Sequence, residues 1–323
     1  MVRAETPVFR RRAVHGNVWL ERANGRGTLA DESAQLARLP VFDLHPEVLE
    51  SEDAVGQAML RELEATAAAK RGDLVVVILG GRGAQALHRM LGQLAVAGDP
   101  DGLIRRLRVF TQDALAPMRM DNSFSFVRDF ERLLGADFFR VAKSFTSMRT
   151  DAADLEAELG GYVEQLEAAG GVDVCFLGHG PEPGGASHLA YIRPGSGATA
   201  HDVAGIIPIS PNLLDHHLTK FKAGGTNPPP QDEEECRRAT HILTIGPAVI
   251  LGANRIVQSI VDADTAPAKK ISYRMVMEAE IDCDPEERAR QLDENPGFWI
   301  RLHPNVRSLV LPNLCCPVKP VPS

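Results

Sequence analysis

The sequence predicts an α/β fold, with a doubly wound, mostly parallel sheet flanked by helices. Two observations predict it: short unbroken apolar runs, and helical apolar spacing in the segments between them. The clearest runs are Leu74–Leu79 and Asp173–Leu177. A strand that is covered on both faces is apolar throughout. Strands that alternate with helices are joined by right-handed crossovers, so they lie parallel in one sheet.

The elements can be justified in chain order. A helix is expected over Glu52–Ala69, because Val55, Ala58, Met59 and Leu63 recur at helical spacing before a polar turn. The other expected helices lie near Ala84–Ala97, Ser123–Leu134 and Ala152–Ala169. The other expected strands lie near Arg108–Thr111, Thr240–Gly246, Arg255–Val261 and Val306–Leu311.

Composition excludes several classes of protein. The chain has 323 residues, 44% hydrophobic and 24% charged, which is typical of an ordinary globular protein. A net charge of −8 argues against duplex nucleic acid as a partner. No apolar run approaches a membrane span, and the start lacks the core of a signal peptide. Five scattered cysteines show no zinc spacing and favour a reducing compartment, so we expect a cytoplasmic location and no metal.

Residue composition and apolar patterning divide the chain into three parts. We expect an N-terminal extension over residues 1–40, one α/β domain over 41–312 and a tail over 313–323. Arg10-Arg11-Arg12 is interpreted as a solvated arm. Thr219–Glu235, with glycines, prolines and an acidic run, is expected to form a long loop that is either a binding element or simply mobile.

Ligands of such sheets bind beyond the carboxyl ends of the strands. That rule selects four segments: Gly80–Gly83, Thr111–Asp113, Gly178–His188 and the turn after Val261. The glycine loop Gly80-Gly81-Arg82-Gly83 opens a helix, where free N–H groups can hold an anion, although a plain tight turn explains it equally well.

Side chains for proton transfer follow two of these strands. Asp113 is placed to act as a base, or alternatively to cap the next turn. Two histidines, Glu182 and Arg193 fall in the glycine-rich stretch Gly178–Ser196. Imidazole moves protons near neutral pH when a carboxylate orients it. A site is favoured over a plain surface loop there.

Five stretches in order resemble the glucosamine-6-phosphate deaminase / 6-phosphogluconolactonase family, the deaminase branch more closely. They are Leu79–Gly83, Val109–Asp113 with Ser123-Phe124, Asp173–Ser196, Leu243–Val257 and Arg301–Val306. The likeness runs from about Val41 to Leu311. In Asp173–Ser196, His-Leu-Ala-Tyr-Ile-Arg-Pro-Gly-Ser stands where the family has His-Ile-Ala-Phe-Asn-Glu-Pro-Gly-Ser.

The resemblance implies a sugar-phosphate enzyme that shuttles protons without a cofactor. Asp113 would move the proton during aldose–ketose isomerisation, and His188 would open the sugar ring. The glycine loop, Ser196 and a late lysine, Lys269 or Lys270 with Lys270 preferred, would hold an anionic small molecule. A homo-oligomer is compatible with this reading.

The differences between this sequence and the family signature fall at the predicted site. Arg193 replaces the signature's glutamate, Arg82 replaces the serine or threonine of the phosphate loop, and the downstream Arg-x-Lys is missing. Glu182 is the candidate substitute for a lost carboxylate. Arg82, Arg193 and Lys270 are expected to converge as a new anion clamp. Three functions stay open: an isomerase or deaminase with an altered site, a degenerate sugar-phosphate sensor or scaffold, and a repurposed enzyme of specialised metabolism.

Overall fold

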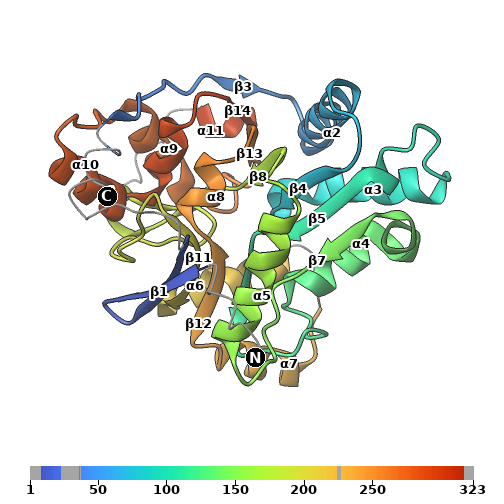
Figure 1. Ribbon diagram of the computed structural model, residues 1–323, viewed down its shortest axis with the longest axis horizontal. Helices are drawn as coiled ribbons and strands as arrows, with labels where there is room; N and C mark the ends of the chain where they lie inside the picture. The colour runs from blue at the N-terminus through green and yellow to red at the C-terminus, as the bar shows by residue number, and fades with distance from the viewer. Residues whose placement is uncertain (1–8, 23–35, 37, 224–226, 316–323) are drawn as a thin grey trace, which may run out of the picture.

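A seven-stranded parallel sheet forms the centre of the molecule (Figure 1). The computed structural model describes residues 9–22, 36, 38–223 and 227–315. The strand pairings in this sheet are parallel, which confirms the predicted fold class. In spatial order the strands are β3 (Pro46–Val48), β14 (Val306–Val310), β13 (Arg255–Ile260), β8 (Val174–Leu177), β4 (Leu74–Ile78), β5 (Leu107–Thr111) and β7 (Ser144–Thr146).

Helices bury both faces of this sheet, so each central strand contributes to two cores. Along β4, Val75 and Val77 belong to one core, whereas Val76 and Ile78 belong to the other. This alternation explains why β4 is apolar at every position. Besides α6 and α7, which are described below, the α-helices of the described residues are α2 (Glu52–Ala69), α3 (Gln85–Val96), α4 (Phe126–Val141), α5 (Leu155–Ala168), α8 (Pro247–Leu251), α9 (Ala268–Glu278), α10 (Pro285–Glu294) and α11 (Pro312–Cys315).

A second, antiparallel sheet was not predicted. Its order is β1 (Phe9–Val14), β2 (Asn17–Arg22), β11 (Asp202–Pro208), β12 (His241–Ile245) and β6 (Asp113–Ala116). The strand expected over Thr240–Gly246 exists as β12, but its assignment to the parallel sheet was wrong. It pairs antiparallel with both β11 and β6. The reason is that β6 leaves the parallel sheet directly after β5 and gives β12 a different partner.

The interpretation of Arg10–Arg12 as a solvated arm was right about exposure, because Arg10 and Arg11 are exposed, but wrong about the arm. These residues lie in β1, which pairs with β2 in a hairpin at the edge of the second sheet. The hairpin is anchored by Trp19, which is fully buried and donates its indole N–H to the carbonyl of Ser196 at 3.0 Å. Residues 23–35 of the expected extension, and residues 316–323 of the expected tail, lie outside the described part.

The long loop expected over Thr219–Glu235 is mostly helical. Helix α6 (Pro211–Ala223) begins before it, and α7 (Pro230–Arg237) fills its second half, while residues 224–226 lie outside the described part. Leu213, His217 and Phe221 are buried at helical spacing along α6. Of the prolines that suggested a loop, Pro228 and Pro229 precede α7 and Pro230 is its first residue.

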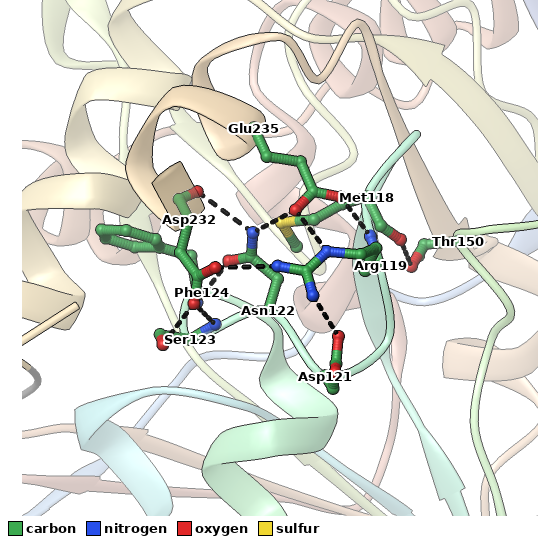
Figure 2. A network of polar contacts seen from close by, with 9 residues as sticks. All are labelled: Met118, Arg119, Asp121, Asn122, Ser123, Phe124, Thr150, Asp232 and Glu235. Atoms are coloured by element: carbon green, nitrogen blue, oxygen red, sulfur yellow. Dashed lines mark hydrogen bonds and ion pairs between the residues drawn. The ribbon is translucent and has the colours of Figure 1, made fainter. Parts of the chain in front are cut away.

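A polar network fastens α7 to the segment before α4 (Figure 2). The guanidinium of Arg119 donates to Asp232 at 2.8 Å and to Glu235 at 2.9 Å. The Asn122 amide donates to the Asp232 carbonyl at 3.0 Å and to Glu235 at 2.9 Å, and the Ser123 hydroxyl donates to Asp232 at 2.6 Å. The network fixes the segment that ends at Phe124. No helix in the described part of the chain is long and apolar enough to cross a membrane.

Candidate active site

A cleft of about 780 Å³, its open mouth included, lies at the carboxyl ends of the parallel strands. All four segments selected from the sequence reach it: the glycine loop after β4, the residues after β5, the loop after β8 and the turn after β13. Helix α6 supplies a further wall through His217, Lys220 and Phe221. Parallel strands therefore bring sequence-distant polar groups to one edge, as this fold predicts.

The glycine loop forms a close-fitting turn at the floor of the cleft. Gly81 has a φ of +81°, which glycine adopts without strain, and the Phe126 ring lies directly against Gly80. The loop continues into a 3₁₀ helix, Arg82–Ala84, and then into α3. The first N–H groups of a helix have no carbonyl partner within it. Because Gly81–Gly83 line the cleft, these groups are available to an anion there.

Asp113 occupies the junction between the two sheets. Gln112 is the single residue between β5 and β6, and its side-chain amide donates to Asp113 Oδ2 at 2.5 Å. Within the described part of the chain, Oδ1 has no hydrogen-bond partner. Burial raises the pKa of Asp113 to about 7, against the opposing effects of Gln112 and Lys220. A carboxyl with such a pKa can accept a proton and return it near neutral pH.

His188 faces the same cleft and has a carboxylate partner. Its Nδ1 lies 2.7 Å from Glu182 Oε1, and both side chains are nearly buried. Burial lowers the pKa of His188, while the Glu182 carboxylate opposes that shift. In neutral His188, Nδ1–H donates to Glu182 and Nε2 is left as an acceptor. Glu182 is thus the carboxylate partner of His188.

The expected arginine clamp does not assemble. The Arg193 side chain is absent from the cleft lining and donates to the Pro208 and Pro194 carbonyls at 3.0 and 3.2 Å. Arg82 lines the cleft, but its guanidinium is paired with Glu52 at 2.6 Å. Ser196 is buried away from the lining, where its carbonyl accepts from Trp19.

Of the two candidate lysines, Lys269 and not Lys270 lines the cleft. Lys269 lies in the first turn of α9, buried, with its Nζ 2.5 Å from Asp262 Oδ1. Burial alone would raise the pKa of Asp262, but the Lys269 and Lys220 ammonium groups lower it to about 2. Lys269 is therefore neutralised by its own carboxylate.

One group of the cleft, Lys220, was missed from the sequence, and another, His179, was noted there without a role. Lys220 of α6 is partly buried, and burial lowers its pKa to about 8; it makes no hydrogen bond or ion pair within the described residues. His179 lies with Nε2 2.8 Å from the Ser272 hydroxyl, and burial lowers its pKa well below the ordinary value. The buried spacing of Leu213, His217 and Phe221 was the available signal for the helix that carries Lys220.

Several solved structures have the same fold. A monomeric glucosamine-6-phosphate deaminase aligns over 84% of this chain and 99% of its own, with a TM-score of 0.63 and 19% identity. The 6-phosphogluconolactonase of Trypanosoma brucei aligns over 85% and 98%, with a TM-score of 0.58 and 18% identity. That of Thermotoga maritima aligns over 84% and 99%, with a TM-score of 0.55 and 14% identity.

The chain has the fold of these enzymes. No protein-family model matches the sequence, and no curated protein matches it either. At such low identity the agreement concerns the path of the backbone rather than the reaction. The activity must therefore be argued from the side chains of the cleft.

Gly180 sets the position of the His188 ring. Strand β9 (Gly180–Pro181) pairs Gly180 with His188 of β10 (Ser187–His188), and a Cβ at residue 180 would fall on the imidazole. We predict that Gly180→Ala displaces the ring from its buried position. The pKa of His188 then rises toward its ordinary value of about 6.5. NMR titration of the histidine signals measures this change.

The same substitution should lower the free energy of unfolding by roughly 1–3 kcal/mol, the usual cost of overpacking. Gly161→Ala in α5 is the control, because nothing lies within 4 Å of the added methyl group. An unchanged His188 titration in a folded Gly180→Ala protein would contradict this placement.

Proposed function

We propose that the protein is an enzyme that acts on a phosphorylated sugar or amino sugar by moving protons at C1 and C2. One observation carries the proposal: His188, which is paired with Glu182, and Asp113, whose Oδ1 has no hydrogen-bond partner among the described residues, line one cleft. The fold shared with a glucosamine-6-phosphate deaminase supports it. The reaction would be an isomerisation, with or without deamination.

His188 has the features needed for ring opening. Its Nε2 would take the proton from the C1 hydroxyl, the bond between C1 and the ring oxygen would break, and the ring oxygen would receive the proton. Glu182 at Nδ1 would stabilise the imidazolium that exists between these two transfers. The arginine at position 193 removes the signature's glutamate, and Glu182 offers a replacement carboxylate.

Asp113 would act on the open chain. Its carboxylate would take the proton from C2 and return it to C1, while the proton of the C2 hydroxyl would pass to the C1 oxygen; together these transfers convert an aldose into a ketose. A pKa of about 7 suits both directions, because the protonated and deprotonated forms coexist near neutral pH. The lone Oδ1 is the oxygen that is free to do this.

Lys220 is the best candidate for the cation that holds the phosphate. Lys269 is paired with Asp262, and Arg82 with Glu52. Among the cationic side chains of the described cleft lining, Lys220 is left without a carboxylate partner. A bound phosphate would supply that partner, together with the N–H groups of Gly81–Gly83.

A matched pair of variants tests this assignment. Lys220→Met should weaken binding of glucose 6-phosphate by roughly tenfold or more, since a charged hydrogen bond is lost. Arg193→Met should leave the affinity unchanged, because that guanidinium holds backbone carbonyls outside the cleft. Calorimetric titration measures both. Wild-type affinity should fall as pH rises above about 8, where Lys220 loses its proton. Equal losses in both variants would contradict the assignment.

The function itself is tested by a thermal-shift screen followed by product analysis. The panel contains glucosamine 6-phosphate, glucose 6-phosphate, fructose 6-phosphate and 6-phosphogluconolactone. We expect at least one aminohexose or hexose phosphate to raise the melting temperature and to be converted. Asp113→Asn should bind that compound but turn it over at least about 100-fold more slowly.

Other outcomes of this screen would support a different function or mechanism. A sugar phosphate that stabilises the protein and is never converted would support a sensor or scaffold instead. Hydrolysis of the lactone alone would support the lactonase reaction. Full activity of Asp113→Asn would remove Asp113 from the mechanism.

A further inference from the structure

Tyr191 stands where the resembled signature has phenylalanine, so this chain adds a hydroxyl group to a residue that lines the cleft. The hydroxyl lies 3.1 Å from Nδ1 of His217 on α6. His217 Nε2 in turn lies 2.8 Å from the backbone carbonyl of Phe124. All three residues are buried. The chain of contacts starts at the cleft and ends on the segment that the Arg119 network fastens to α7 (Figure 2).

The donor and acceptor of each hydrogen bond can be assigned from the last group in the chain of contacts, the Phe124 carbonyl. A carbonyl oxygen can only accept, so His217 Nε2 carries a hydrogen and donates to Phe124. Burial lowers the pKa of His217 to about 4, so the ring is neutral near pH 7 and Nδ1 has no hydrogen. The Tyr191 hydroxyl must therefore donate to Nδ1. Burial also raises the pKa of Tyr191 well above its ordinary value, which keeps its proton in place.

With its only hydrogen committed to His217, the Tyr191 oxygen can offer nothing but lone pairs to a ligand. It would accept a hydrogen bond from a hydroxyl or amino group and would leave a group without a donor unsatisfied. The Tyr191 ring packs against two other rings: its centroid lies 5.1 Å from that of His188 and 6.2 Å from that of Phe126. These contacts leave the side chain little freedom to turn away.

The backbone also holds Tyr191 in an uncommon conformation. Ala190 and Tyr191 have φ values of +51° and +57°, a region that residues other than glycine seldom occupy. The Thr244 hydroxyl donates to the Ala190 carbonyl, and Leu189 and Ile192 exchange two backbone hydrogen bonds across the turn. Strain of this kind persists where the surrounding structure enforces it, often at ligand sites.

We propose that Tyr191, oriented by His217, is a specificity residue that accepts a hydrogen bond from the C2 substituent of the substrate. The inference rests on the proposed function. C2 is singled out because Tyr191 packs beside His188, the group assigned to C1, and lines the same cleft as Asp113, the group assigned to C2. The C2 substituent is therefore a hydroxyl or an amino group.

The test compares ligands that differ only at C2. Affinities of glucosamine 6-phosphate, glucose 6-phosphate and 2-deoxyglucose 6-phosphate are measured by calorimetry with the wild type and with Tyr191→Phe. We expect the wild type to prefer each of the first two over the deoxy compound. In Tyr191→Phe that preference should shrink by roughly fivefold to tenfold, which corresponds to one lost hydrogen bond, while the affinity for the deoxy compound stays the same.

Tyr162→Phe is the matched control. Tyr162 is equally buried and donates its hydroxyl to the Thr111 carbonyl at 2.6 Å, but it does not line the cleft. It should reproduce the loss of stability and leave the preference at C2 unchanged. If Tyr191→Phe does not fold, the variant that also carries His217→Phe replaces it, because it leaves neither partner of that hydrogen bond unsatisfied.

The outcomes separate this inference from the proposed function. If the wild type binds none of the three sugar phosphates, both the role of Tyr191 and the proposed function are overturned. If the wild type binds them and the preference at C2 is unchanged in Tyr191→Phe, only the role of Tyr191 is overturned. An equal loss of affinity for all three ligands also overturns it, because that pattern belongs to a structural residue.

Discussion

The peptide of Gln112 joins the two sheets, and the candidate site depends on that junction. Its N–H donates to the carbonyl of Ile78 at the end of β4, and its carbonyl accepts from the N–H of Ile245 at the end of β12, both at 3.0 Å. The chain therefore passes from the parallel into the antiparallel sheet within one residue. Asp113 follows immediately and is held in the buried angle between the sheets, where no solvent shell can stabilise its charge.

Pairing of charges determines what the rest of the cleft can do. Arg82 and Arg193 are the main differences from the resembled family in the sequence. Both guanidinium groups are already bonded, that of Arg82 to Glu52 and that of Arg193 to backbone carbonyls. Lys269 is likewise paired. Among the cationic side chains of the described cleft lining, Lys220 makes no hydrogen bond or ion pair with the described residues, and His188 has Glu182 as its carboxylate partner. The site is rearranged rather than dismantled.

The sequence predicted the parts of the site that follow strands directly. Asp113 and the glycine loop lie where strand ends place them, because unbroken apolar runs locate buried strands well, and His188 lies in the hairpin that follows β8. The choice between Lys269 and Lys270 depends on the rotation of α9, which spacing alone did not resolve. Lys220 was missed because the glycines and prolines after α6 suggested a loop over its last turn.

Long-range partners account for the remaining differences. The direction of Arg193 is decided by the Pro208 carbonyl, and the burial of Trp19 by its packing against Gly205 in β11. Neither contact leaves a periodic trace in the sequence. The antiparallel sheet went unpredicted for the same reason, since its strands come from segments far apart in the sequence.

Solvent exchange tests the central claim, that a buried carboxylate at the sheet junction moves a proton on a sugar phosphate. The sugar phosphate that binds best is incubated with the protein in D₂O, and deuterium at C1 and C2 is followed by NMR. The account predicts incorporation whose rate rises with pH through about 7 as Asp113 loses its proton, and none with Asp113→Asn. A bound sugar phosphate that exchanges no deuterium, or exchanges equally in Asp113→Asn, would contradict it.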